Sequence, residues 1–75
     1  MLIAVPKERR PNETRVAATP ETVKKLNALG CEIVVEAGAG SGAKIADQLY
    51  ADAGAKIAGS AAEALKSADI VLKVA

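Results

Sequence analysis

Histidine, phenylalanine and tryptophan are missing from this chain, and each absence excludes a class of function. There is no histidine and one cysteine, Cys31, so the sequence offers neither the usual ligands of a zinc site nor an internal disulfide. One tyrosine is the sole aromatic residue, so no series of aromatic side chains is available for stacking on nucleic-acid bases. The sequence therefore predicts neither a metal centre nor nucleic-acid binding.

Long apolar runs and a strong net charge are also missing. No stretch approaches the roughly 18 apolar residues of a membrane-spanning helix, and the apolar start Met1–Val5 is too short for a signal peptide. The formal net charge of +1 gives no strong attraction to nucleic acid or membranes. We expect one soluble segment in a reducing compartment, with Cys31 as a buried thiol rather than a nucleophile.

Strand and helix patterns alternate along the chain. The expected strands are Leu2–Val5, Glu32–Glu36, Ala55–Ala58 and Ile70–Val74. This alternation predicts an α/β fold, a parallel-sheet layered unit of the flavodoxin or Rossmann-like kind with the element order βαβαβαβ. We expect the strand order 2-1-3-4. Because the last parallel strand would leave an open edge, we also expect an incomplete domain that is the front part of a larger one.

Capping residues place three helices between these strands. The expected N-caps are Thr19 before Pro20, Asp47, and Ser60 in a capping box with Glu63. Gly30 and Gly54 are expected to end the first two helices, because glycine readily adopts the left-handed conformation that follows a helix. Val23, Leu26 and Leu29 recur at helical spacing, so we expect them to face the core.

The connection between the first strand and the first helix is the most informative segment. From Lys7 to Arg15 it reads K-E-R-R-P-N-E-T-R, with acidic residues interleaved among the basic ones. Connections of this kind usually have about 2–6 residues, so a long charged one indicates a functional segment more than a plain solvated loop. The mixed charge favours a small anion over a polyanion. It leaves the carboxyl end of a strand beside the expected reversal of strand order, where open α/β sheets bind ligands.

Gly38–Ala43 forms a second pattern, G-A-G-S-G-A, which fits the dinucleotide fingerprint G-x-G-x-x-(G/A). The fingerprint also needs an acidic residue at the end of the next strand, and here that strand runs into Ala58-Gly59-Ser60. The following helix is expected to begin only at Asp47, beyond the glycines. These departures favour a close-packed turn over a phosphate-binding loop.

The stretch from Ala4 to Gly30 resembles the N-terminal signature shared by alanine dehydrogenases and the alpha subunit of proton-translocating NAD(P) transhydrogenase. The matching positions are Pro6, Glu8, Asn12, Glu13, Arg15, Val16, Ala17, Thr19, Pro20, Val23, Leu26 and Gly30. Ala4 replaces a usual glycine and Ala28 replaces a usual polar or basic residue, and neither change removes a ligand group. The later runs V-E-A-G-A-G, A-G-A-K-I and A-D-I-V-L-K-V extend the resemblance over essentially the whole chain.

The resemblance implies that residues 1–75 begin the N-terminal domain of a two-domain protein whose Rossmann NAD-binding domain follows. In the alanine dehydrogenase branch, the residue matching Arg15 pairs with the substrate carboxylate, which suits the planar guanidinium fork. That branch also has a substrate-binding lysine two positions beyond Lys73. Ala75 stands there, so the resemblance favours the transhydrogenase branch, as does the run Arg9-Arg10-Pro11.

The implied function of the full-length parent is NAD(P) transhydrogenase activity, in which hydride passes between NAD(H) and NADP(H) and is coupled to proton translocation. Its implied cofactors are NAD and NADP. Its implied partners are the rest of the alpha subunit, as a homodimer, and the beta subunit or NADP-binding domain. The implied location is the cytoplasmic face of a membrane-embedded complex, with this segment peripheral to the membrane part.

The residues that act in hydride transfer are expected beyond Ala75, and the isolated segment is expected to be inactive and to bind no cofactor. The candidate residues are Arg15, Lys7, Glu13 and Lys73, which would shape the wall of a cleft facing the other domain. Two alternatives stay open. One is an amino-acid oxidoreductase of the alanine dehydrogenase type, and the other is a non-enzymatic α/β module that self-associates.

Overall fold

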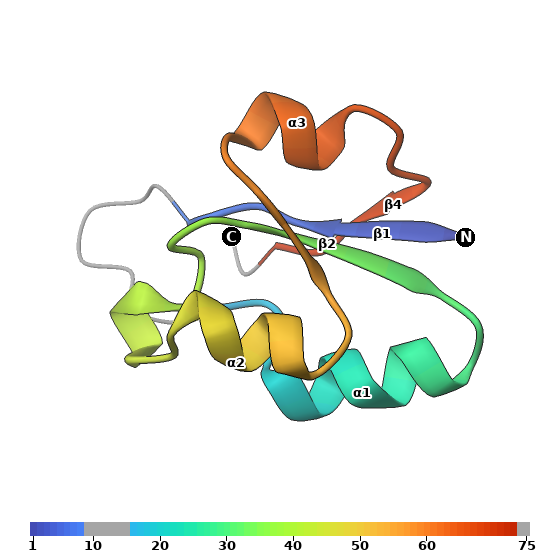
Figure 1. Cartoon of the computed structure of the whole chain (residues 1–75). Coiled ribbons are helices and arrows are strands. Elements are labelled where there is room, and N and C mark those ends of the chain that lie inside the picture. The colour runs from blue at the N-terminus through green and yellow to red at the C-terminus, as the bar shows by residue number, and fades with distance from the viewer. Residues whose placement is uncertain (9–15, 74–75) are drawn as a thin grey trace.

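The computed structural model describes residues 1–8 and 16–73 of the chain. The strands are β1 (Leu2–Val5), β2 (Glu32–Glu36), β3 (Lys56–Ala58) and β4 (Ile70–Val71). The helices are α1 (Pro20–Ala28), α2 (Asp47–Asp52) and α3 (Ala61–Leu65), with a 3₁₀ turn, η1, at Ser41–Ala43. The strands form one parallel sheet with helices on both sides (Figure 1), which confirms the predicted α/β class.

The strand order is β3-β2-β1-β4, so the predicted order 2-1-3-4 is wrong. Helices α1 and α2 cover one face of the sheet and α3 covers the other (Figure 1). Right-handed crossovers over one face advance the strands in a single direction, which places β3 outside β2. The crossover through α3 passes over the opposite face, so it reverses direction and brings β4 to the far side of β1. The reversal therefore lies between β1 and β4.

The face under α1 and α2 carries the main apolar core. Its buried members are Ile3, Val5, Ala18, Val23, Ile33, Val35, Ala39, Tyr50, Ala53 and Ala55. On the opposite face Ala4, Ala58 and Ala64 are buried, so α3 packs on the sheet through small side chains. In β2, Ile33 and Val35 are buried and Val34 between them is partly buried, as expected of a strand covered on both faces.

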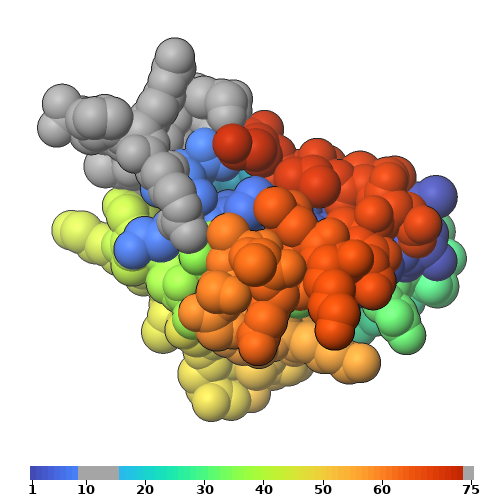
Figure 2. Space-filling view, turned by 90° about the horizontal axis from the view of Figure 1, so that it is seen from above, coloured from blue at the N-terminus to red at the C-terminus, as the bar shows by residue number. Residues whose placement is uncertain are grey.

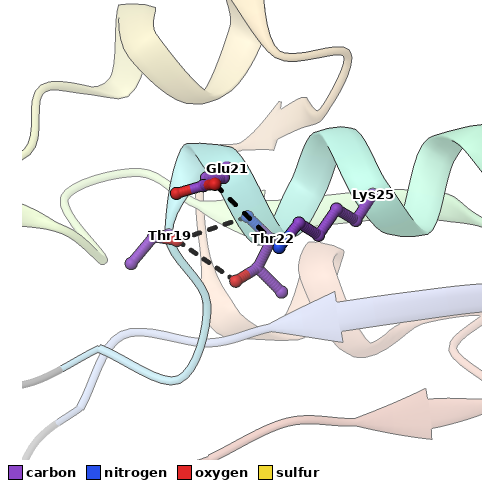
Figure 3. Close-up of polar contacts among 4 residues, drawn as sticks. All are labelled: Thr19, Glu21, Thr22 and Lys25. Atoms are coloured by element: carbon purple, nitrogen blue, oxygen red, sulfur yellow. Dashed lines mark hydrogen bonds and ion pairs between the residues drawn. The ribbon is translucent and has the colours of Figure 1, made fainter.

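Helix α1 begins as the sequence predicts. The hydroxyl of Thr19 accepts a hydrogen bond from the Thr22 N–H at 3.3 Å, and Pro20 occupies the first helical position (Figure 3). Glu21 and Lys25 form an ion pair at 3.9 Å on the same turn. Both side chains of that pair are largely exposed, so it adds little stability. Gly30 follows the helix with φ 91°, which confirms the predicted glycine end.

The predicted cap of α2 differs from the structure, whereas the predicted cap of α3 is confirmed. Ala46, with no side-chain bond, is the N-cap of α2, and Asp47 is the first helical residue; its carboxylate accepts the Gly38 N–H at 2.9 Å. At α3 the Ser60 hydroxyl accepts from the Glu63 N–H as predicted, but the Glu63 carboxylate accepts from the Gly59 N–H. In both cases a carboxylate takes an N–H from a neighbouring turn that would otherwise lack a partner.

The structure also differs from the prediction at the end of α1, at Cys31 and at the end of β4. Leu29 is 79 % exposed, because α1 ends at Ala28 and Leu29 leaves the helical stripe. Cys31 is partly buried against the core rather than enclosed by it. Strand β4 ends at Val71 rather than at Val74, and Val74 lies outside the described residues. In the described parts of the chain, no helix has the length and apolarity needed to cross a bilayer.

Candidate functional site

Two of the predicted site residues lie at the carboxyl ends of neighbouring strands. Lys7 follows β1 and Lys73 follows β4, and these strands pair in parallel with Ala4 beside Val71. Both lysines are exposed. Figure 2, seen from the α3 side, shows the red β4 segment beside the blue residues of β1. The corrected strand order thus places the two lysines on either side of the reversal, where open α/β sheets bind ligands. Arg15 and Glu13 lie outside the described residues.

Glu36 holds the start of the connection that leaves β1. Its carboxylate accepts the backbone N–H of Lys7 at 2.8 Å, and the residue is only 5 % exposed. Since a buried carboxyl group is costly unless hydrogen-bonded, this bond helps to stabilise the buried side chain, and it fixes the Lys7 backbone. Among the described residues Glu36 is the one buried charged residue. Glu36 thus sets the direction in which the chain leaves β1.

The turn after β2 is held from two sides. Gly38 has φ 81°, and its N–H is bonded by Asp47 at the start of α2. The Lys7 side chain lies over this glycine: a Cβ added at Gly38 would be 3.7 Å from the Lys7 Nζ. The Lys7 backbone and side chain therefore both contact the segment that follows β2.

The glycine turn does not fit the pyrophosphate of a dinucleotide. A Cβ added at Gly40 would be 2.7 Å from the Tyr50 ring and 2.8 Å from Ile45, so protein atoms already fill the space beside the backbone. The Gly38 N–H is taken by Asp47, and α2 begins only after the turn. The predicted close-packed turn is confirmed.

Among residues 1–8 and 16–73, no group of three acidic or thiol side chains could hold a metal ion.

Tyr50 holds the other end of the same connection, just before α1. Its hydroxyl donates to the Ala18 carbonyl at 2.7 Å, and the side chain is fully buried. Burial raises the pKa of Tyr50 above its ordinary value of 10.0, and the nearby Asp47 carboxylate raises it further. Val16 and Ala17, which precede Ala18, pack against the core. The chain is thus anchored again before the helix starts.

Sequence patterns did not identify Glu36, the Asp47 bond to Gly38 or the Tyr50 hydroxyl. A usable signal was present for two of them. Glu36 is an acidic residue at the carboxyl end of an apolar strand, where sites form in parallel sheets. Tyr50 is the sole aromatic residue, and a buried tyrosine hydroxyl usually finds an acceptor. The Asp47 bond depends on how the glycine turn folds back on α2, which spacing does not reveal.

Comparison with known sequences gives a consistent family. Residues 4–75 match the profile described as "Alanine dehydrogenase/PNT, N-terminal domain". The chain is 61 % identical over 74 residues to an NAD(P) transhydrogenase subunit alpha polypeptide of Rhodospirillum rubrum, covering 99 % of this chain and 19 % of that protein. It is 51 % identical to the Haemophilus influenzae NAD(P) transhydrogenase subunit alpha over 74 residues, 99 % of this chain and 14 % of that protein. Against the alanine dehydrogenase of Methanococcus maripaludis it is 45 % identical, with coverage of 99 % and 20 %.

Solved structures agree with these sequence matches. An L-alanine dehydrogenase superposes with a TM-score of 0.93 at 42 % identity, over 97 % of this chain and 20 % of that one. A transhydrogenase from Sinorhizobium meliloti superposes with a TM-score of 0.90 at 53 % identity, over 97 % of this chain and 21 % of that one. The chain spans about a fifth of the length of these relatives.

Proposed function

Because the chain belongs to the alanine dehydrogenase/PNT N-terminal domain family, we propose that it is the N-terminal segment of the alpha subunit of an NAD(P) transhydrogenase. The observation that carries this proposal is the higher sequence identity to transhydrogenase alpha subunits than to alanine dehydrogenases. Ala75 supports it as well, because the alanine dehydrogenase branch is expected to have a substrate-binding lysine there.

The whole protein, in this proposal, transfers hydride between NAD(H) and NADP(H) and couples the step to proton translocation. Residues 1–75 form the beginning of the N-terminal domain, and a Rossmann domain further along the chain holds NAD(H). The close-packed glycine turn supports this division, because the Tyr50 ring and Ile45 occupy the space beside Gly40. NADP(H) belongs to a beta subunit or NADP-binding domain, and the alpha subunit forms a homodimer at the cytoplasmic face of the membrane complex.

The role of this segment is to present charged side chains to the other domain rather than to perform chemistry. Lys7 and Lys73 support the proposal by their position on both sides of the strand reversal. Arg15 and Glu13 belong to the same connection in the sequence as Lys7. The Arg15 guanidinium offers several hydrogen-bond donors in a fixed plane, so it is well suited to bind an anionic nucleotide or a carboxylate.

The Arg15 proposal is tested by substitution in the whole protein. We expect Arg15→Ala to lower the hydride-transfer rate about tenfold or more. Without this side chain, the surface that faces the other domain would change and the two domains would align less well. Arg15→Lys keeps the charge without the planar fork and is the matched control. If Arg15→Ala left both the NADH affinity and the transfer rate unchanged, Arg15 would have only a structural role.

The function itself is tested by two assays on the same preparation. Transhydrogenase activity predicts reduction of an NADP⁺ analogue by NADH when the partner subunit is present. The alanine dehydrogenase alternative, favoured by the close superposition on an L-alanine dehydrogenase, predicts NADH oxidation that depends on pyruvate and ammonia. Activity in the second assay alone would overturn the proposal.

A further inference from the structure

We infer that Glu36 and Tyr50 are positioning residues that fix the two ends of the β1–α1 connection for hydride transfer. This inference rests on the proposed function. It goes beyond that function by assigning a role to two residues that lie outside the charged connection. Both come from the segment that begins in β2 and ends in α2, so one unit of the fold holds both ends.

The end that leaves β1 is fixed through the Lys7 backbone. A hydrogen bond of 2.8 Å joins the Lys7 N–H to a carboxylate that is almost completely buried. Because the acceptor is almost completely buried, water does not readily replace this bond. Glu36 lies at the end of β2, next to β1 in the sheet, so its own position is set by the strand pairing.

The end that enters α1 is fixed through the Ala18 backbone. The Tyr50 hydroxyl donates to the Ala18 carbonyl at 2.7 Å, and both residues are buried. Tyr50 cannot shift easily, because its ring is enclosed by the core and lies against Gly40 of the turn. The Thr19 cap then begins the helix directly after this anchor.

The two anchors are themselves linked. Asp47, three residues before Tyr50, accepts the N–H of Gly38, which lies two residues after Glu36. The distance between the two anchoring side chains is therefore set by β2, the bonded turn and α2. A shift of about 1 Å in a positioning group can cost about 10²-fold in rate, so a change in this arrangement is expected to lower the rate of hydride transfer.

The experiment uses the whole protein and compares Glu36→Ala, Glu36→Gln and Tyr50→Phe. Three quantities are measured: the transfer rate at saturating nucleotides, the NADH dissociation constant, and hydrogen exchange of the Lys7 amide. Glu32→Gln is the matched control, because Glu32 is an exposed glutamate at the opposite end of β2. Gly54→Ala is a second control that lowers stability at the other end of the sheet through a residue with φ 106°.

Glu36→Ala and Tyr50→Phe are each expected to lower the transfer rate about 10- to 100-fold with an NADH dissociation constant close to that of the wild type. Glu36→Ala should also speed exchange of the Lys7 amide. Glu36→Gln retains an acceptor oxygen and should recover most of the rate. Tyr50→Phe, which removes a single hydroxyl, keeps the test decisive if Glu36→Ala fails to fold.

Folded Glu36→Ala and Tyr50→Phe proteins with the wild-type rate would overturn the inference, as would an equal loss of rate in Gly54→Ala. A wild-type protein that transfers no hydride would instead overturn the proposed function. The two failures are therefore distinguishable.

Discussion

Tyr50 shows at the residue scale how one polar atom in the core links stability to pH. Burial and the Asp47 carboxylate raise its pKa above 10.0, so the folded protein keeps the phenol protonated at pH values where the unfolded chain ionises. The unfolded state then binds fewer protons than the native state, and the free energy of unfolding falls as pH rises above about 10. Below that pH the contribution is fully present.

We therefore expect Tyr50→Phe to remove this alkaline loss of stability. At neutral pH the same substitution should lower the free energy of unfolding by about 1–3 kcal/mol, because the buried Ala18 carbonyl loses its donor. Urea unfolding between pH 7 and 11 measures both effects. An unchanged alkaline slope in Tyr50→Phe would mean that another group titrates.

Two glycines at the residue scale separate backbone strain from side-chain overlap. Gly30 has φ 91° with open space beside it, whereas Gly54 has φ 106° and an added Cβ would overlap the side-chain amide of Asn27. Gly30→Ala should cost about 1–2 kcal/mol from backbone strain alone. Gly54→Ala should cost more, since Asn27 must also give up its bond to the Gly54 carbonyl.

Thermal unfolding of both single variants measures this difference. In an Asn27→Ala background the overlap is gone, so the extra cost of Gly54→Ala should disappear. A difference that persisted there would assign it to the backbone instead.

At the scale of the element, helix α1 depends on one capping side chain. Thr19→Ala removes the acceptor for the Thr22 N–H and should lower the free energy of unfolding by about 1 kcal/mol. Lys25→Ala breaks only the exposed pair with Glu21 and should change stability by less than about 0.5 kcal/mol. Denaturant midpoints of the two variants give the comparison, and equal effects would mean that the cap is not what starts the helix.

The helices also show how far an element can be predicted from local sequence. Thr19, Gly30 and Gly54 were assigned correctly because each acts on its own backbone neighbourhood. The prediction of Asp47 as an N-cap is wrong, because its carboxylate bonds the Gly38 N–H of the preceding turn. A spacing rule identifies the donors a carboxylate can reach, but the fold of the adjacent turn decides which one it bonds.

At the scale of the whole molecule, the parallel α/β class followed from the alternation of strands and helices, but the strand order did not. Order depends on which face each helix covers, and that choice depends on long-range packing. Helix α3 lies over Ala4 and Ala58, two small residues that the strand patterns did not mark as a helix-covered face. The expected position of the Lys7 segment beside the reversal does not depend on this difference, because the segment leaves β1 and β1 lies at the reversal in either order. Glu36 was missed since its partner, the Lys7 N–H, is 29 residues away in sequence.

The corrected order predicts how the sheet opens. Strands β1 and β2 each have a neighbour on both sides, whereas among the described residues β4 pairs only with β1, and its two residues are half-exposed. Amide hydrogens of Val5 and Val34, which face the central β1–β2 pairing, should therefore exchange slowest, and that of Leu72, bonded to the Ala4 carbonyl, should exchange much faster. Native-state hydrogen exchange measures this ranking. Leu72 protection equal to that of Val34 would show that β4 is not an edge strand.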